Sequence, residues 1–367
     1  MPQPAVRSGE EHVDVRAGAS AYQVVIAAGL TARLPALLDA AALPARRFIV
    51  SNPTVWRLHG EAFDGLTGEP PILVPDGERF KTLASVGRIY DALIARSADR
   101  ATALIAIGGG VVGDVAGFAA ATYLRGVPVV QVPTTLLAQV DSAIGGKVGV
   151  NHPLGKNLIG AFHQPALVAV DLDLPATLPR REFRAGLYEV VKYGVIASRE
   201  LFEEIRNALP GLFARHRDTL LPVIAACCRI KARVVEEDER ESGVRRSLNF
   251  GHTIGHALEA VTKYRRFRHG EAVAYGMLVA AEMAVRRGVM PPADREALAA
   301  VIRQMGPLPA LADLPAGRIL EAVAHDKKVV AGRLHFVLPG PIGSTVIATD
   351  VAPAELRNAL AAIRPSA

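Results

Sequence analysis

Short apolar stretches alternate with amphipathic segments through the first half of the chain. Runs of roughly four to eight apolar residues, closed by Gly, Pro or Asn, are typical of strands buried on both faces. Such runs lie at residues 22–27, 47–52, 71–75, 103–109, 128–134 and 166–172. The intervening segment 83–97 has apolar residues at helical spacing. Alternating strands and helices predict an α/β domain with a Rossmann-like, largely parallel sheet that helices cover on both faces.

The pattern changes after Leu178 and Pro179. From there to about residue 330 the chain is rich in Ala, Leu, Glu and Arg at helical spacing. Residues 333–339 and 344–350 read as a short hairpin near the end. We therefore predict two domains, an α/β domain over residues 1–178 and an all-helical domain over residues 179–367.

Composition and charge narrow the class of ligand. Hydrophobic residues make up 50% of the chain and aromatic residues 5%, which suits packed α/β layers better than an aromatic binding surface. Lys and Arg number 42 against 36 Asp and Glu, and the net charge of +6 favours anionic small molecules. The chain has no run of five or six Lys or Arg, which argues against nucleic acid as a partner.

The sequence shows no signal for secretion or for a membrane. The N-terminus lacks the apolar segment of a signal peptide, and the longest apolar region is interrupted by Asp114 and several glycines. Adjacent Cys227 and Cys228 read as buried thiols in a reducing compartment, because two vicinal cysteines do not make a disulfide framework. We expect a soluble, cytoplasmic protein with no membrane partner.

A glycine-rich turn follows the fourth predicted strand. Gly108, Gly110 and Gly113 have the G-x-G-x-x-G spacing, which lets a backbone approach a pyrophosphate at a helix N-terminus. The acid that usually holds the ribose about 20 residues later is missing, because residues 128–135 read PVVQVPTT. An acid from the polar loop 76–81 would have to replace it. The turn therefore indicates either a nucleotide site or close packing of a helix on a strand.

A polar loop punctuated by glycines is expected over residues 131–165. Glycine turns precede Lys147 and Lys156, and lysines and asparagines on such loops suit a phosphate or a carboxylate. The polar side chains of this segment are Thr134, Thr135, Asp141, Lys147, Asn151, His152, Lys156 and Asn157. A polar surface loop is the alternative, but the apolar sequence on either side favours a ligand loop.

Three histidines and a glutamate in the helical half suggest a metal site. His252 and His256 are four residues apart, so a helix places both imidazoles on one face, and His269 follows thirteen residues later. Glu189 lies three residues before Lys192 in an apolar helix, where a buried carboxylate needs a cation. Such a set can hold Zn²⁺ with an open position, although a pair of histidines alone is more often part of a core or a surface.

Glycines and charged residues accompany the histidines. Gly251 and Gly255 are predicted to keep the helix thin where a ligand approaches. The charged and polar residues near the histidines are Lys231, Glu241, Arg245 and Asn249, and HDKK at 325–328 adds two lysines. Each is a solvated charge by default, but together they suit an anionic substrate.

With these residues assembled, the chain resembles the 3-dehydroquinate synthases. The resemblance runs from about residue 45 to 340 and rests on the blocks DGERFK, GGGVVGDVAGFAAATYLRG, VPTTLLAQVDSAIGGKVGVNHPLGKNLIGAFHQP, RAGLYEVVKYG, SLNFGHTIGHALE, HGEAVAYGM and HDKK, in that order. It implies an N-terminal nucleotide-binding domain, a helical C-terminal domain and an active site in the cleft between them. It also implies bound NAD, a zinc or cobalt ion, and a homodimer.

The resemblance implies roles for individual residues. The metal ligands would be Glu189, His252 and His269, so that His256 contacts substrate instead of metal. The substrate contacts would be Asp141, Lys147, Asn157, Lys192, Lys231, Arg245, Asn249, His256 and Lys328, with Arg125 reaching the substrate of the partner subunit. The catalytic residues would be Lys147, Lys192, Glu241, Asn249 and His256. The NAD contacts would be Asp76, Gly77, Glu78, Arg79, Phe80, Lys81, Gly110, Val111, Val112, Gly113, Asp114, Thr134, Thr135, Lys147, Lys156, Leu174, Pro175, Ala176 and Thr177.

The reaction of this family needs such a mixture of sites. Its substrate, 3-deoxy-D-arabino-heptulosonate 7-phosphate, is oxidised by NAD, loses phosphate, is reduced again and closes to 3-dehydroquinate by an intramolecular aldol step. One site must then hold cofactor, metal, phosphate and carboxylate together. Two other enzyme classes share the architecture, a sister cyclase acting on sedoheptulose 7-phosphate and a metal-dependent polyol or glycerol-phosphate dehydrogenase. A non-catalytic NAD-binding scaffold would have no need of the metal set.

The chain departs from the family's usual pattern at a few positions, which are Ala143, Ile144, Val148, Tyr188 and Tyr275. Tyr188 replaces a commonly small residue directly beside Glu189. None of these changes removes an expected ligand, so they bear on substrate detail more than on the class of reaction.

Overall fold

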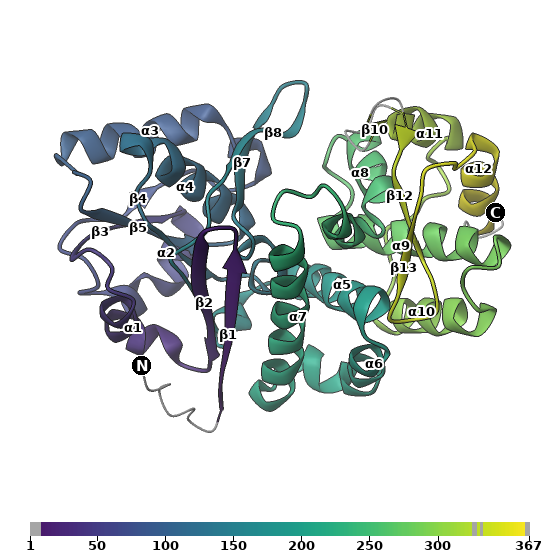
Figure 1. Ribbon diagram of the computed structural model, residues 1–367, viewed down its shortest axis with the longest axis horizontal. Coiled ribbons are helices and arrows are strands. Elements are labelled where there is room, and N and C mark those ends of the chain that lie inside the picture. The colour runs from purple at the N-terminus through teal and green to yellow at the C-terminus, as the bar shows by residue number, and fades with distance from the viewer. Residues whose placement is uncertain (1–8, 325–328, 331–332, 364–367) are drawn as a thin grey trace. The chain divides into compact units, whose positions relative to one another are not determined.

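The computed structural model describes residues 9–324, 329–330 and 333–363 (Figure 1). Contacts divide the chain into two compact units, called unit 1 and unit 2 below. Unit 1 contains Met1–Pro179 and Arg215–Arg240, and unit 2 contains Arg180–Ala214 and Glu241–Ala367. The first change of unit falls one residue from the predicted boundary, but the chain later returns to unit 1.

This return corrects the predicted division at residue 178. Helix α7 (Arg217–Glu237) belongs to unit 1, although its sequence pattern placed it in the helical domain. The backbone N–H of Arg16 donates to Glu236 at 3.0 Å, and Arg229 pairs with Glu11 at 3.0 Å, so that α7 packs against the first strand. Helical periodicity predicts a buried face, but it does not say which neighbour covers that face.

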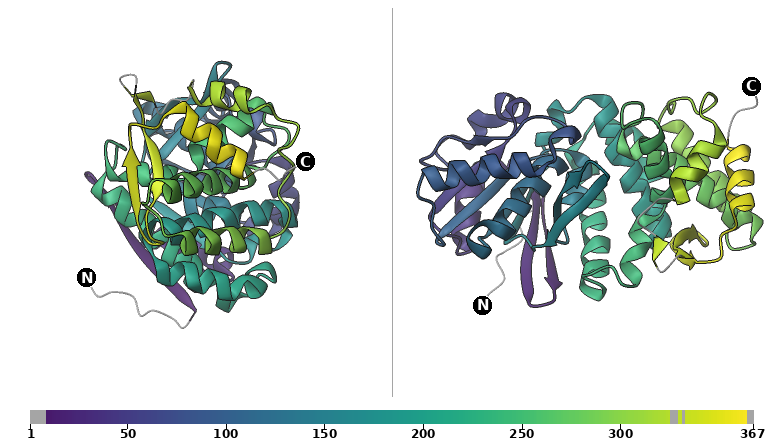
Figure 2. Two further views of the ribbon diagram at one scale, coloured as in Figure 1. Left: turned by 90° about the vertical axis from the view of Figure 1, so that its right-hand side faces the viewer. Right: turned by 90° about the horizontal axis from the view of Figure 1, so that it is seen from above.

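A seven-stranded sheet forms the centre of unit 1, in the order β1-β2-β9-β6-β5-β3-β4. Its strands are β1 (Glu10–Ala17), β2 (Ser20–Ala27), β3 (Arg46–Ser51), β4 (Ile72–Leu73), β5 (Thr102–Gly108), β6 (Val129–Pro133) and β9 (Leu167–Asp171). All neighbouring strands are parallel except β1 and β2, which form a hairpin at the edge of the sheet (Figure 2). The six predicted strands and the α/β class are confirmed.

Helices cover both faces of this sheet, and successive strand residues alternate between the two cores. On β3, Phe48 and Val50 pack with α3 (Leu83–Ala95) and α4 (Gly110–Thr122). Ile49 points to the other face, with α1 (Leu34–Ala40) and α2 (Pro53–His59). Burial on both faces explains why these strands read as continuous apolar runs. Each fully buried Val, Ile or Phe contributes about 1.5–3 kcal/mol to folding.

The segment predicted as a glycine-punctuated loop is instead a hairpin, β7 (Lys147–His152) and β8 (Gly155–Phe162). A short π-helical turn, Ala138–Ser142, precedes it. The hairpin packs on α4, where a Cβ on Gly117 would lie 2.4 Å from a methyl of Val148. A glycine of α4 therefore permits this close packing, and within the hairpin a Cβ on Gly149 would lie 2.5 Å from the backbone oxygen of Ile159. Lys147 and Lys156 stand on strands.

Unit 2 is mainly helical. Its helices are α5 (Arg180–Ala197), α6 (Arg199–Phe213), α8 (His252–Val261), α9 (His269–Arg286), α10 (Pro292–Gln304), α11 (Ala316–Ala324) and α12 (Pro353–Ala362), with the 3-10 turn η7 (Val244–Asn249). Helix α9 contacts α5, α8, α10 and α12 and is buried along most of its length. Among the described helices of the chain, none combines the length and the apolar character that crossing a bilayer requires.

The description of the second domain as all-helical is wrong in detail. β12 (Phe336–Pro339) pairs with β13 (Thr345–Ala348), as the two apolar stretches near the end of the chain predict. A second ladder joins β10 (Val329–Val330) to β11 (Arg333–Leu334). These strands are short, so their periodicity in the sequence is weak.

Candidate active site

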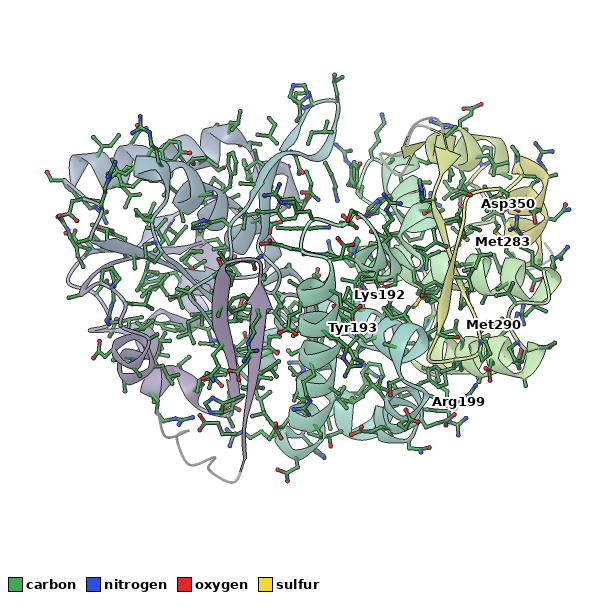
Figure 3. The ribbon with its side chains drawn as sticks, in the orientation of Figure 1. Lys192, Tyr193, Arg199, Met283, Met290 and Asp350 are labelled. Carbon is green, nitrogen blue, oxygen red and sulfur yellow. The ribbon has the colours of Figure 1, made fainter. Side chains whose placement is uncertain are left out.

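Helix α5 carries a fully buried ion pair. Its residues from Ala185 to Ile196 are all buried, so the helix cannot direct its polar side chains to water. Glu189 and Lys192 lie three residues apart, with the ammonium 2.5 Å from Glu189 Oε2, and both side chains are at most 1% exposed. The ammonium also lies 5.0 Å from the ring centre of Tyr193, and both residues are labelled in Figure 3. The expected burial of the pair is confirmed.

The carboxylate of Glu189 is close to two histidines. His252 is the first residue of α8 and His269 the first residue of α9. Their Nε2 atoms lie 3.8 Å and 3.5 Å from Glu189 Oε1. One donor atom from each of the three residues lies within 4.8 Å of the other two. The structure therefore brings together the three residues that the family resemblance implies as metal ligands.

This donor set fits a divalent metal ion. Neither oxygen of Glu189 accepts a hydrogen bond of ordinary geometry from the described part of the chain, although both are buried. A buried carboxylate without hydrogen bonds is costly unless a cation compensates it. Two imidazole nitrogens and one carboxylate oxygen are the ligands that catalytic zinc sites use, with a fourth position left for water or substrate.

The Nδ1 atoms of the two histidines have their own acceptors. Nδ1 of His252 lies 3.1 Å from the backbone oxygen of Phe250. Nδ1 of His269 lies 3.2 Å from Oε2 of Glu259, a buried residue of α8. Because a carbonyl and a carboxylate only accept hydrogen bonds, each Nδ1 carries the proton and each Nε2 keeps its lone pair for a metal. Sequence reasoning missed Glu259, although an acid in the apolar helix that carries two histidines was a usable signal.

His256 lies beside the donor set without belonging to it. Its ring centre is 5.5 Å from that of His252 and 6.0 Å from that of His269. It forms a second possible group with Glu259 and His269, again with donor atoms within 4.8 Å. Glu189, His252 and His269 therefore form one possible donor set, and His256 belongs to the other.

Gly251 and Gly255 do not face a ligand, so their predicted role is wrong. A Cβ on Gly251 would lie 2.7 Å from the backbone oxygen of Val273, and φ at Gly251 is +79°. A Cβ on Gly255 would lie 3.2 Å from the backbone of Ala272 and Val273 in α9. The two glycines let α8 lie directly against α9, which brings the rings of the first residues of these helices to 5.2 Å.

Of the remaining predicted residues of unit 2, Glu241, Arg245 and Asn249 precede α8 in the chain. Arg245 is buried in η7, and Nδ2 of Asn249 donates to Oε1 of Glu241 at 2.5 Å. Lys328 lies outside the described residues. Tyr188, beside Glu189, is buried, and burial raises the pKa of its phenol to about 12, so the ring stays neutral.

Unit 1 gathers a second set of predicted residues around buried lysines. Lys81 pairs with Asp114 and donates to Oδ1 of Asn157 at 2.5 Å. Burial raises the pKa of Asp114, and the neighbouring ammonium of Lys81 partly offsets this. Lys231, also buried, pairs with Asp141. The first set of contacts joins the residue after η3 (Glu78–Phe80) to α4 and β8, and the second joins α7 to the π-helical turn Ala138–Ser142.

The polar loop 76–81 contacts the hairpin. Nδ2 of Asn151 donates to Oε1 of Glu78 at 2.8 Å, and Lys156 lies 3.7 Å from the same carboxylate. The hydroxyl of Thr54 donates to Asp76 at 2.8 Å. Lys147, the first residue of β7, is exposed. Glu78 therefore lies beside the β7–β8 hairpin, and its charge also acts on Asp114 of α4.

The glycine turn serves packing and leaves a helix N-terminus open. A Cβ on Gly108 would lie 2.6 Å from Val112, and one on Gly113 would lie 2.6 Å from Gln131. Packing therefore accounts for two of the three glycines of the motif. Gly109 caps α4 without a side-chain acceptor, so the first N–H groups of this helix, from Gly110 onward, suit an anion.

Six further predicted positions lie in unit 1. Thr134 is buried and its N–H donates to Gly108 at 2.9 Å, while Thr135 accepts from the N–H of Ala138 at 3.2 Å. Leu174–Thr177 form the turn η6, in which Thr177 Oγ1 lies 2.8 Å from Nε2 of His59.

Arg125 is exposed in a turn of unusual backbone geometry. It has φ +68° and follows Leu124 at φ +48°. Two consecutive left-handed residues that are not glycine cost about 1–3 kcal/mol each and persist only when the surrounding structure holds them. The turn fixes the position on the surface of unit 1 from which the side chain of Arg125 extends.

The fold and the donor set indicate the class of protein. Unit 1 is an α/β unit with a glycine turn of the kind found at nucleotide sites, and unit 2 is a helical unit with a candidate divalent-metal site. Comparisons then give the family. Profiles described as the N-terminal and C-terminal parts of 3-dehydroquinate synthase match residues 71–185 and 186–329. A 3-dehydroquinate synthase of Pelotomaculum thermopropionicum is 47% identical over 348 residues, which cover 93% of this chain and 94% of the relative. The chain belongs to the 3-dehydroquinate synthase family, and the predicted resemblance is confirmed.

Solved structures agree with the fold. ValA, the 2-epi-5-epi-valiolone synthase of Streptomyces hygroscopicus subsp. jinggangensis, has NAD⁺ and Zn²⁺ bound. It is 32% identical with a TM-score of 0.86, over 95% of this chain and 98% of that one. A 2-deoxy-scyllo-inosose synthase complexed with carbaglucose-6-phosphate, NAD⁺ and Co²⁺ is 27% identical with a TM-score of 0.85, over 95% and 99%. This chain thus shares its fold with sugar phosphate cyclases over nearly its whole length.

Proposed function

We propose that this chain is a 3-dehydroquinate synthase that converts 3-deoxy-D-arabino-heptulosonate 7-phosphate to 3-dehydroquinate and phosphate, a step of the shikimate pathway towards aromatic amino acids. The observation that carries the proposal is the buried Glu189, with His252 and His269 beside it, in a chain 47% identical to a relative of that name. Two imidazoles lie beside a buried carboxylate that has one ammonium next to it and accepts no hydrogen bond of ordinary geometry from the described residues, and such a set suits a metal-dependent reaction.

Glu189, His252 and His269 hold the metal in this proposal, as zinc or cobalt, and unit 1 holds NAD. When bound, the metal supplies Lewis acidity to a substrate hydroxyl and NAD supplies reversible hydride acceptance. The buried Lys81 contacts both the partly buried Asp114 of α4 and Asn157 of β8, and so links the hairpin to α4. The open N–H groups in the first turn of α4 suit the pyrophosphate. Glu78 and Asp76 are the acids available to the ribose hydroxyls.

The cationic side chains bind the two anionic ends of the substrate. Lys192 and Arg245 are buried in unit 2, and Lys231 is buried in unit 1. A buried cation is worth most to a ligand that brings the matching negative charge. Lys147, Asn157, Asn249 and Asp141 complete the proposed contacts by hydrogen bonding, and Lys328 adds a further cation. His256 is placed beside the metal ligands to hold a substrate proton at an imidazole nitrogen.

We further propose a cytoplasmic homodimer in which Arg125 reaches the phosphate of the partner's substrate. The exposed arginine on a strained turn supports this role, and the buried thiols of Cys227 and Cys228 suit a reducing compartment. Sedimentation gives the oligomeric state. In mixed dimers, an Arg125→Ala subunit paired with a His252→Ala subunit should recover part of the lost activity only if the arginine acts across the interface.

A sister cyclase acting on sedoheptulose 7-phosphate is the second candidate, because ValA is 32% identical over 95% of the chain. The test incubates the zinc-loaded protein with catalytic NAD and 3-deoxy-D-arabino-heptulosonate 7-phosphate and follows phosphate. Many phosphates released per NAD, with no net NADH, support the proposal. Turnover of sedoheptulose 7-phosphate alone would make the chain a sister cyclase. NADH accumulating with a polyol would make it a dehydrogenase.

A further inference from the structure

A buried carboxylate that no part of the proposed reaction uses contacts one of the metal-site histidines. Glu259 lies on α8, seven residues after His252, and is 4% exposed. Its Oε2 lies 3.2 Å from Nδ1 of His269, the nitrogen on the far side of the ring from the one that approaches Glu189. The contact crosses from α8 to α9 and joins residues ten apart in sequence.

Local structure gives no reason for an acid at this position. Glu259 lies in the last turn of α8, where a negative charge opposes the helix dipole. Burial of a carboxylate is also unfavourable unless its partners compensate the lost hydration. The position is thus unfavourable for an acid on the grounds of helix dipole and burial, and the contact with His269 supplies compensation.

We propose that Glu259 is a positioning residue for the metal site, holding the tautomer and the ring orientation of His269. By accepting the Nδ1 proton it keeps the Nε2 lone pair directed to the side of Glu189, 3.5 Å away. The proposal rests on the metal site of the proposed function. It also predicts that the rings of the two histidines are held with different strength. Nδ1 of His269 faces a carboxylate, whereas Nδ1 of His252 bonds to the uncharged backbone oxygen of Phe250.

A different role is available to the same carboxylate. Donor atoms of His256, Glu259 and His269 also lie within 4.8 Å of one another, so Glu259 could itself be a ligand in a second arrangement. The observed geometry favours positioning, because His269 presents Nδ1 to Glu259 and Nε2 to Glu189. Substitution by glutamine separates the two roles. Its amide oxygen still accepts from an N–H, whereas a neutral amide is a poor zinc ligand.

The experiment compares Glu259→Ala, Glu259→Gln and His269→Ala with the parent protein. Zinc affinity is measured by competition with a chromogenic chelator, and the site geometry by the visible spectrum of the cobalt-loaded protein. The unfolding temperature of the metal-free protein reports on folding alone. Glu282→Gln is the matched control, since Glu282 is an ion-paired, partly buried glutamate of α9 far from the donor set.

Zinc affinity should fall by about 10–100-fold in Glu259→Ala, by less than about tenfold in Glu259→Gln, and further in His269→Ala than in either. The cobalt spectrum should change in Glu259→Ala, while Glu282→Gln matches the parent. Parent affinity and spectrum in Glu259→Ala would overturn the positioning role. Loss of metal in Glu259→Gln as complete as in His269→Ala would make Glu259 a ligand instead. A parent protein that binds no zinc would refute the metal site itself and with it the proposed function.

Discussion

At the level of single residues, the candidate site depends on one buried carboxylate that accepts no hydrogen bond of ordinary geometry from the described residues. Glu189 is fully buried, and the nearest cation, Lys192, lies three residues along the same helix. Glu189 can be recognised in the sequence as a candidate site residue because it is an acid within an otherwise apolar helix. Glu259 could not be assigned in the same way, since its partner His269 lies across a loop and only the fold brings the two within 3.2 Å. Local spacing finds residues that share a helix face, and it misses pairs that meet between helices.

Separate substitution of the two histidines of α8 should distinguish the residue that binds zinc from the residue that affects only the rate of reaction. His252→Ala removes one of three donors, so bound zinc and activity should be lost together. His256→Ala should keep one zinc per chain yet lower the rate by about 10²–10⁴-fold, the range for a group that moves a proton. Metal content by atomic emission and phosphate release measure the two effects. Loss of zinc in His256→Ala would contradict the division of roles.

At the level of elements, the site exists because two helices approach at glycine. A Cβ on Gly276 of α9 would lie 1.8 Å from the backbone oxygen of Gly251 at the start of α8. The sequence shows these glycines but not the residues that pack against them. It therefore predicts that Gly251 and Gly255 make room for a ligand, whereas they make room for α9. The strands of the parallel sheet were foreseen because burial on both faces makes them continuous apolar runs. β1 and the β7–β8 hairpin were missed because their apolar residues alternate or are separated by glycines.

Gly276→Ala should weaken the packing and the metal site together. The added methyl forces α8 and α9 apart, so the free energy of unfolding should fall by about 1–3 kcal/mol or more, with weaker zinc binding. Gly87→Ala in α3 is the control, because a Cβ there meets nothing within 4 Å. It should leave zinc binding unchanged and stabilise the helix by roughly 0.5–1 kcal/mol. Thermal unfolding and chelator competition report both quantities, and equal behaviour of the two variants would refute this account of the packing.

The link between α9 and α12 should make stability depend on pH. Arg287 donates to both oxygens of Glu355 at 2.8 Å, and these hydrogen bonds lower the pKa of that carboxyl from 4.5 to about 2. Because the pKa is lowered on folding, the stabilisation is present above pH 4.5 and is lost as pH falls towards about 2.

Glu355→Gln should therefore lower the unfolding temperature at pH 7 and approach the parent near pH 2. The effect should be about 1 kcal/mol or less, since the pair is partly exposed. Glu321→Gln, at an exposed glutamate of α11, should show no such trend. A difference between Glu355→Gln and the parent that stays constant over this pH range would contradict the assignment.

At the level of the whole molecule, two units divide the proposed ligands. The candidate metal ligands lie in unit 2, and the residues proposed for NAD lie in unit 1. The sequence predicted where the chain first passes from one unit to the other but missed the return, because an amphipathic helix such as α7 could pack on either unit. Fold class and family could thus be predicted, and the three residues that the resemblance implies as metal ligands lie together. The membership of α7 depended on tertiary contacts.

This division predicts that the two binding functions can be impaired separately. Lys81→Ala removes the ammonium that pairs with Asp114 and bonds to Asn157, so NAD affinity should fall at least about tenfold. Zinc content should stay at the parent value. Lys263→Ala, at an exposed lysine of unit 2, should change neither. Calorimetry with NAD and metal analysis give the two results, and zinc loss in Lys81→Ala would show that the functions are coupled.

The return of the chain to unit 1 has a consequence during synthesis on the ribosome. Nascent domains tend to fold in the order in which they emerge, yet unit 1 lacks α7 until residue 237 has been made. Residues 180–214, which belong to unit 2, emerge before that and must wait for the rest of their own core. A nascent chain released between these points would carry an unfinished sheet with the β1–β2 hairpin uncovered. Such truncated chains are natural targets for chaperones and proteases, so the order of segments in this protein sets a long interval of vulnerability before either unit is complete.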